Sequence, residues 1–244
     1  MFLSIDNRKE FINKFLHPLG KLSESLVIKV SKDRIYSIGS SSDGTLILYS
    51  SFDQKNDTSD TLHLNIPDVN RLTKVLGCIT DDSVQVDING NNISYKSDNI
   101  GFKYHLLEDG IITTPAVSIE KIKKLKFDLS FDIDYINIIA LLKGSTFATE
   151  TDKLYFYTKE GSVYGQLTDM DRHNVDVYTQ KITDKFTGTS IPTAIPLNFE
   201  TVRIICGLRF DKLRVSVNTD MKVFIFDIEQ ENTNLSFISS AYIS

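Results

Sequence analysis

The sequence predicts an α+β protein of two similar domains, each with two helices packed on antiparallel sheet. One observation is an amphipathic helix that opens on Ile-Pro and closes on Gly at 66–77 and again at 195–207. A second is that most of the remaining chain alternates apolar and polar residues in short runs between turn residues, as half-buried strands do. The third is that the two prolines lie 129 residues apart in a chain of 244, which indicates a duplication.

The first copy of this helix is expected over residues 67–77. Pro67 suits the first helical position, where a missing N–H costs nothing, and Gly77 is able to end the helix in the left-handed conformation. The apolar face comprises Val69, Leu72, Val75, Leu76 and Ile79. The opposite face comprises Asn70, Thr73, Lys74 and Gly77, with Arg71 on its flank. A single helix of this kind is most often only a solvated surface, so its recurrence is what favours a shared role.

Composition favours a soluble protein. The chain is 41% hydrophobic and 24% charged, and no apolar run approaches the roughly 20 residues of a membrane span. The first six residues lack the pattern of a secretory signal, so we expect a cytoplasmic protein with no membrane partner. Cys78 and Cys206 are expected to be reduced and buried. The net charge of −5 argues on average against nucleic acid, but the distribution of the charges matters more.

The first half of the chain reads as a helix at 8–20 followed by strands. Phe11, Ile12, Phe15 and Leu16 form the apolar face of this helix, and Pro18 and Gly20 are expected to end it. Strands are expected at 25–30, 34–38, 45–49, 61–64, 83–88, 93–96 and 101–107. Asn89-Gly90 is a strong hairpin signal, and the polar stretch 51–60 is an exposed loop.

The second half repeats this order. The expected domains are 1–110 and 127–244, joined by a lysine-rich connector at 111–126. A third helix is expected over 132–142, with Ile133, Ile136, Ile139 and Ala140 on its core face, and a fourth over 196–209. Strands are expected at 153–157, 162–167, 175–182, 212–217, 222–227 and 235–243.

Positive charge gathers on the predicted helices. Each pair covers one side of a sheet, so we expect all four to form one layer with their polar faces pointing the same way. Their net charges are +2 for the first, with Arg8 counted, +1 for the second, −1 for the third and +1 for the fourth. The helices therefore sum to +3, which leaves −8 on the rest of the chain. A basic layer on an acidic molecule suits contact with a phosphate backbone.

The order of elements and the stretch from Asp68 through Leu76 resemble the DNA polymerase sliding clamps, most closely those of T-even-like bacteriophages. This resemblance spans nearly the whole chain through its repeat and implies the DNA clamp fold. It also implies a homotrimeric ring of two-domain chains with helices lining a hole around duplex DNA. The partners it implies are double-stranded DNA, a DNA polymerase, an ATP-driven clamp loader and two further copies of the chain, in an infected bacterial cell if the protein is phage-encoded.

Applied to this sequence, the resemblance implies one group of residues that face DNA and another group that bind partner proteins. The DNA-facing candidates are Lys9, Lys14, Arg71, Lys74, Lys143 and Arg203. The third helix departs from the pattern, because Asp132 and Asp134 leave its outward face without positive charge except at Lys143. An apolar groove formed by the connector and the tail, residues 235–244, is expected to bind a partner peptide. Its candidates are Ile111, Ile112, Val117, Ile119, Ile122, Tyr242 and Ile243.

The sequence favours a protein that is not an enzyme. The four histidines are scattered, no CxxC occurs, and neither a phosphate-cradling glycine loop nor a G-x-S-x-G elbow is present. Asp169 and Asp171 beside Arg172 are expected to be a polar turn, so no catalytic residue, metal or cofactor is predicted. Two alternatives remain open. A non-catalytic β-rich viral structural or adhesion protein predicts no gathering of cations on helices, and an enzyme with an unrecognised site predicts a deep pocket of convergent titratable groups.

Overall fold

The computed structural model describes residues 2–122, 124–191 and 194–242. Its internal contacts divide the chain into two compact units. Unit 1 comprises Met1–Val117 and Gln230–Leu235, and unit 2 comprises Ser118–Glu229 and Ser236–Ser244. The division at Val117 falls inside the expected connector, where α4 (Ile119–Ile122) is a single helical turn. No helix in the described ranges is long and apolar enough to cross a membrane.

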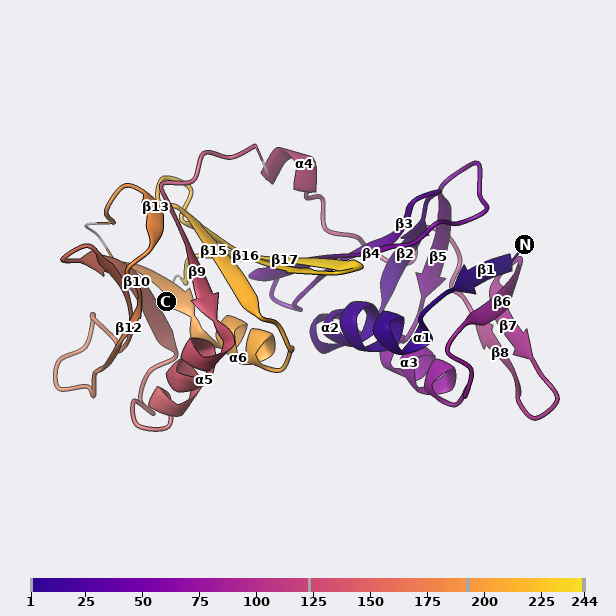
Figure 1. The fold of residues 1–244 in the computed structure, drawn as a ribbon, viewed down its shortest axis with the longest axis horizontal. Helices are drawn as coiled ribbons and strands as arrows, with labels where there is room; N and C mark the ends of the chain where they lie inside the picture. Colours follow the sequence, from indigo (N-terminus) through magenta and orange to yellow (C-terminus); the bar gives the residue numbers. More distant parts are fainter. Residues whose placement is uncertain (1, 123, 192–193, 243–244) are drawn as a thin grey trace. The chain divides into compact units, whose positions relative to one another are not determined.

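Unit 1 contains two antiparallel sheets and two helical segments (Figure 1). Its strands are β1 (Phe2–Ile5), β2 (Leu26–Val30), β3 (Arg34–Ser40), β4 (Leu46–Asp53), β5 (Leu62–Ile66), β6 (Val84–Asn89), β7 (Asn92–Lys96) and β8 (Gly101–His105). One sheet has the order β1-β6-β7-β8, and the strands β5-β2-β3-β4 pair in this order as part of a larger sheet. The first helical segment consists of α1 (Arg8–Glu10), η1 (Phe11–Leu16) and α2 (His17–Leu22), and the second is α3 (Val69–Gly77).

Unit 2 repeats this arrangement. Its strands are β9 (Leu129–Asp134), β10 (Lys153–Lys159), β11 (Ser162–Leu167), β12 (Tyr178–Thr183), β13 (Phe186–Gly188), β14 (Ile195–Asn198), β15 (Lys212–Asn218), β16 (Val223–Gln230) and β17 (Thr233–Ser240). The sheets have the orders β12-β11-β10-β14 and β13-β9-β15-β16-β17, and the helices are α5 (Tyr135–Gly144) and α6 (Phe199–Cys206). The first strand of each unit pairs with the strand after its second long helix, β1 with β6 and β9 with β15. The predicted α+β class with antiparallel sheets is confirmed.

Each unit has its own apolar core. In unit 1, Phe15 and Leu16 of η1 are fully buried together with Ile35 and Leu48 of the sheet. The rings of Phe11 and Phe15 stack with centroids 5.0 Å apart. The fully buried side chains of unit 2 include Phe199, Val202, Leu213, Phe226 and Phe237. The helices therefore bury their apolar stripes on the sheets and leave their other faces exposed, as amphipathic helices do.

Most predicted strands begin and end within about four residues of the observed strands. The sequence did not predict four strands, β1, β9, β13 and β14. The first helix does not stop at Pro18 or Gly20, because α2 continues to Leu22 and is capped at Ser23. The segment before α2 is π-helical. Pro18 is the second residue of α2, where a missing N–H is tolerated as at a helix start.

The repeated Ile-Pro does not start either helix. The side chain of Asp68 accepts a hydrogen bond from Arg71 N at 2.9 Å, which makes Asp68 the N-cap of α3. Pro67 therefore precedes the helix, and Pro196 lies inside β14. The predicted left-handed glycine ends are also wrong, since neither Gly77 nor Gly207 has a positive φ.

The third helix begins at Tyr135, later than predicted, because residues 132–134 complete β9 and pair with β15. This later start changes which residues face the core. Ile138 and Leu141 are buried, and Ile136 is 75% exposed. The predicted core face was therefore wrong at Ile136, and Asp132 and Asp134 do not belong to the helix.

Candidate nucleic-acid interface and assembly edges

The exposed face of α3 carries two cations. Val69, Leu72 and Leu76 are buried on the other face, so the helical period directs Arg71 and Lys74 to solvent. Both are exposed, and neither has an ion-pair partner among the residues that the structure describes. Their charges are therefore available to an anionic ligand.

The first helical segment presents a polar stripe that repeats every fourth residue. Its exposed members are Lys9, Asn13, His17 and Lys21. The sequence analysis missed Lys21, because Pro18 and Gly20 were interpreted as the end of the helix. The four-residue spacing was nevertheless visible in the sequence. Burial and, second, the charge of Lys21 lower the pKa of His17 below its ordinary value.

The two predicted cations on this segment are partly neutralised. Lys9 Nζ lies 2.9 Å from Asp82 Oδ1, and Lys14 forms an ion pair with Glu10 one turn away. The hydrogen bond from Lys14 lowers the pKa of Glu10, and Lys9 lowers that of Asp82. A phosphate would have to compete with these carboxylates for either lysine.

Arg8 is not part of the exposed layer, although the sequence analysis counted its charge there. It is only 6% exposed. Its Nε donates to Asp81 O at 2.8 Å and its Nη1 to Leu76 O at 3.3 Å. A cation at the carboxyl end of α3 meets the negative end of the helix dipole, so Arg8 stabilises that helix end.

The two helical segments of unit 1 touch where α2 and α3 lie side by side (Figure 1). Asn70 Nδ2 donates to Gly20 O at 3.3 Å across this contact. Lys21 and Arg71 are the next residues on the two helices. The packing therefore places these two cations, from separate stretches of sequence, on helices that are in contact.

Unit 2 presents fewer free charges on its helices. Lys143 is exposed in the last turn of α5. Arg203 is exposed on α6, but its Nη1 lies 3.1 Å from Glu200 Oε2 and its guanidinium lies 5.1 Å from the ring centroid of Phe199. Ile136 occupies the exposed face of α5. The neighbouring helices α5 and α6 are joined by the hydrogen bond from Tyr135 OH to Cys206 O at 3.4 Å.

The predicted partner-binding residues differ in exposure. Ile111 is exposed, and Ile112, Val117, Ile119 and Ile122 are half-buried. Tyr242 N donates to Pro196 O at 2.8 Å, and its hydroxyl donates to Asp152 Oδ2 at 3.0 Å. Ile243 lies outside the described residues.

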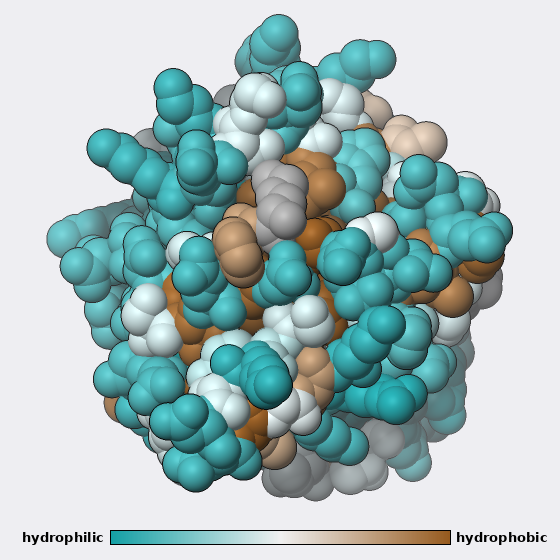
Figure 2. Space-filling model, turned by 90° about the vertical axis from the view of Figure 1, so that its right-hand side faces the viewer, coloured by the Kyte–Doolittle hydropathy of each residue, from teal (hydrophilic) through white to brown (hydrophobic). Residues whose placement is uncertain are grey.

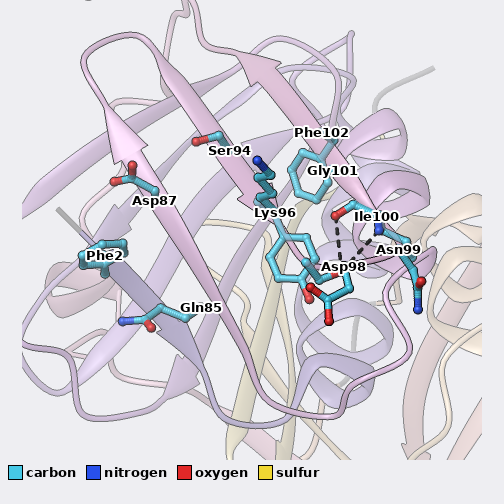
Figure 3. Close-up of a pocket in the computed structure, with 12 residues that line it drawn as sticks. Phe2, Gln85, Asp87, Ser94, Lys96, Asp98, Asn99, Ile100, Gly101 and Phe102 are labelled. Carbon is cyan, nitrogen blue, oxygen red and sulfur yellow. Dashed lines mark hydrogen bonds between the residues drawn. The ribbon is translucent and has the colours of Figure 1, made fainter.

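A shallow hollow of about 730 Å³ lies over the sheet β1-β6-β7-β8. Phe2, Gln85, Asp87, Ser94 and Lys96 line it together with the loop 97–101, and Figure 3 shows Asp87 and Asp98 at opposite ends. Figure 2 looks at the end of unit 1 that bears this sheet and shows a mainly hydrophilic surface with apolar side chains near its middle. The hollow brings no nucleophile and base together. Within the described ranges no three His, Cys, Asp or Glu residues are placed to hold a metal ion.

The sheets end in strands of two kinds. Three outer strands are covered by hydrogen bonds from other segments. The Gln54 side chain donates to Ser4 O and accepts from Asp6 N along β1. Tyr242 N donates to Pro196 O on β14, and Leu107 N donates to Asn65 O on β5 at 2.9 Å. The other outer strands in the described part of the chain are β8, β12 and the three-residue β13. An unpaired edge strand is a template for pairing with another chain.

No protein-family model matches the sequence, and no curated protein matches it. Solved structures do match its fold. The A. fulgidus PCNA bound to the C-terminal region of FEN-1 has a TM-score of 0.77 at 11% identity, over 100% of this chain and 98% of that one. The Entamoeba histolytica proliferating cellular nuclear antigen has 0.76 at 12% identity, over 99% and 98%.

The bacterial clamp subunit gives a similar result. The DNA polymerase III beta chain of Streptococcus pneumoniae has a TM-score of 0.77 at 15% identity, over 100% of this chain and 65% of that one. These likenesses span this chain from end to end, so the chain has the sliding-clamp fold. The predicted clamp fold is confirmed on this ground.

Proposed function

We propose that this protein is a DNA sliding clamp, a non-enzymatic processivity factor that encircles duplex DNA and tethers a DNA polymerase. The carrying observation is the clamp fold over the whole chain, with cations on the exposed faces of its packed helices. Apart from the buried Arg8, the helical residues of α1, η1, α2, α3, α5 and α6, all of them described, contain seven cations and two carboxylates. This gathering of charge speaks against the alternative of a β-rich viral structural or adhesion protein.

The cations on the helices are proposed to bind the duplex through its phosphates. Lys and Arg side chains on helix faces reach phosphates, which position a protein without reading sequence. Lys9, Lys14, Arg71, Lys74, Lys143 and Arg203 are the proposed contacts. Affinity for linear duplex is accordingly weak, falls with salt and does not depend on sequence.

The ring is proposed to close through two of these outer strands, β8 and β12. β8, with five residues, and β12, with six, are similar in length. Pairing β8 of one copy with β12 of the next is a head-to-tail contact, which generates a ring when the rotation closes. Two units per chain and six units around the duplex give a homotrimer. This state and the T-even-like bacteriophage type, in the cytoplasm of an infected bacterium, are part of the proposal.

Partner proteins are proposed to dock on the connector and the tail. The A. fulgidus protein is bound to the C-terminal region of FEN-1, and a C-terminal peptide of the polymerase or clamp loader is the corresponding ligand here. Ile111, Ile112, Val117, Ile119, Ile122, Tyr242 and Ile243 are the proposed contacts. A few buried apolar anchors dominate the affinity of such complexes. A variant lacking residues 241–244 is expected to bind a polymerase C-terminal peptide more weakly than the intact chain.

Two measurements test the proposal. Light scattering over a range of concentrations should show a species of three chains that dissociates on dilution. Fluorescence anisotropy should show weak binding to labelled duplexes, equal for unrelated sequences and lost as salt rises. Binding that persists at high salt and depends on sequence would contradict a phosphate-only contact.

A further inference from the structure

The cations on the helices are divided unevenly between the units. Apart from the buried Arg8, the helical residues of α1, η1, α2 and α3 in unit 1 contain five cations and one carboxylate. Those of α5 and α6 in unit 2 contain two cations and one carboxylate. The net charges predicted from the sequence, +3 for the first two helices and 0 for the last two, point the same way, although they placed Asp132 and Asp134 on a helix and left Lys21 out.

Ion pairing makes the division sharper. In unit 1, Lys21, Arg71 and Lys74 are exposed and have no ion-pair partner within the described ranges. In unit 2, Arg203 is held by Glu200 at 3.1 Å. Among the helical residues of α5 and α6, all of them described, the cation without an ion-pair partner is Lys143, in the last turn of α5.

The three free cations of unit 1 come from two helices that are in contact. Asn70 on α3 bonds Gly20 on α2, and Lys21 and Arg71 follow these two residues directly. Lys74 lies on the exposed face of α3 three residues beyond Arg71. The effect of Lys21 on the pKa of His17 agrees with a locally positive field on the same stripe. Clustered cations attract a polyanion more strongly than the same charges spread apart.

The corresponding face of unit 2 is suited to a different role. Ile136 is 75% exposed on α5, and Ile139 and Ala140 beside it are half-buried. Aliphatic side chains cannot donate hydrogen bonds to phosphate oxygens. A helix with this face can lie beside a duplex without holding its backbone.

We propose that the phosphate contacts to duplex DNA are concentrated in unit 1, on a cluster formed by Lys21, Arg71 and Lys74. The helices of unit 2 contribute little to the affinity. This inference rests on the proposed clamp function and specifies which half of the chain binds the duplex.

The test compares two variants that lose the same charge. The unit 1 variant carries Lys21→Ala, Arg71→Ala and Lys74→Ala. The matched unit 2 variant carries Lys143→Ala, Arg203→Ala and Lys212→Ala, all at exposed positions. Anisotropy of a labelled duplex is measured against salt concentration for the wild type and both variants, and thermal unfolding checks that each variant folds. The logarithm of affinity falls with the logarithm of salt by about 0.9 per phosphate contact.

The expected result is a clearly smaller salt slope for the unit 1 variant and a much smaller reduction for the unit 2 variant, because Lys143 and Arg203 are minor contacts. Equal reductions in both variants would overturn the inference and leave the clamp function standing. A reduction in the unit 2 variant alone, or in neither, would also overturn it. A wild type without salt-dependent duplex binding would instead count against the clamp function itself.

Single substitutions at position 21 isolate the residue that the sequence did not point to. Lys21→Ala should reduce the salt slope, and Lys21→Arg should restore it because the charge is kept. A slope that falls equally for both replacements would show that Lys21 acts through packing and would contradict its role in the cluster.

Discussion

The side-chain amide of Asn70 on α3 donates a hydrogen bond to the backbone oxygen of Gly20 on α2, at 3.3 Å. A Cβ atom at position 20 would lie 2.7 Å from Asn70 Oδ1. With Asn70 in this position, the two helices can therefore approach as they do only with glycine at position 20. Because Lys21 and Arg71 are the next residues on the two helices, the same contact sets the spacing of the proposed DNA-binding cations.

This contact predicts that Gly20→Ala has different effects in two backgrounds. In the wild type the alanine displaces the Asn70 amide, and the lost hydrogen bond, roughly 0.5–1.5 kcal/mol, offsets the gain in helix propensity of about 1 kcal/mol. In an Asn70→Ala background nothing is displaced, so Gly20→Ala should raise the free energy of unfolding by about 1 kcal/mol. Urea unfolding of the four proteins measures this coupling. Equal effects in both backgrounds would contradict the contact.

Arg8 and Lys9 should differ in their effect on stability although they are adjacent. Arg8→Met removes the donor to Asp81 O and one of the donors to Leu76 O, which should lower the free energy of unfolding by about 2 kcal/mol. Lys9→Met removes only an exposed ion pair and should leave the free energy of unfolding nearly unchanged. Urea denaturation compares the two, and an equal cost for both would exclude a capping role for Arg8.

The titration of His17 should report its distance from Lys21. Burial and then Lys21 lower its pKa from 6.5, so the folded protein binds the proton less readily than the unfolded chain does. Stability from this group is therefore complete above pH 6.5 and falls as the pH drops below that value. Lys21→Ala should raise the pKa of His17, followed by NMR of the imidazole, and Lys9→Ala should not. An unchanged titration in Lys21→Ala would place the two groups apart.

The two cysteines should react at different rates. Cys78 is exposed and Cys206 is buried, and burial raises the pKa of the Cys206 thiol to about 11. Because the thiolate is the reactive form, a thiol reagent should modify Cys78 in the native protein and Cys206 only after unfolding. Mass spectrometry of the labelled peptides distinguishes the two sites. Labelling of Cys206 under native conditions would show that the α5–α6 contact opens readily.

The sequence identified the fold class because the strand alternation and the duplicated helices are local patterns. It did not identify helix starts that depend on tertiary pairing. Asp132 and Asp134 are compatible with a helix start, and only their pairing with β15 assigns them to a strand. The expectation that Cys78 is buried was also wrong, because it rested on the general tendency of free cysteine to be buried, whereas Cys78 is exposed just beyond the end of α3.

The candidate site was predicted in part. Arg71 and Lys74 follow from the amphipathic period of α3, and both are exposed. Arg8 was interpreted as an exposed charge because sequence alone does not show that Leu76 O and Asp81 O need a donor. Lys21 was not predicted because the sequence does not show that a π-helical segment precedes α2 and that the helix continues past Pro18.

The measurement that tests the clamp function most directly is topological retention. The protein is incubated at low salt with a nicked circular plasmid or with the same plasmid linearised, cross-linked between amines so that closed rings are fixed, and then passed through a sizing column at high salt. A clamp should remain on the circle, be absent from the linear DNA, and be released from the circle by a single restriction cut. Equal retention on both DNAs, or loss from both, would contradict the proposal that the protein encircles duplex DNA.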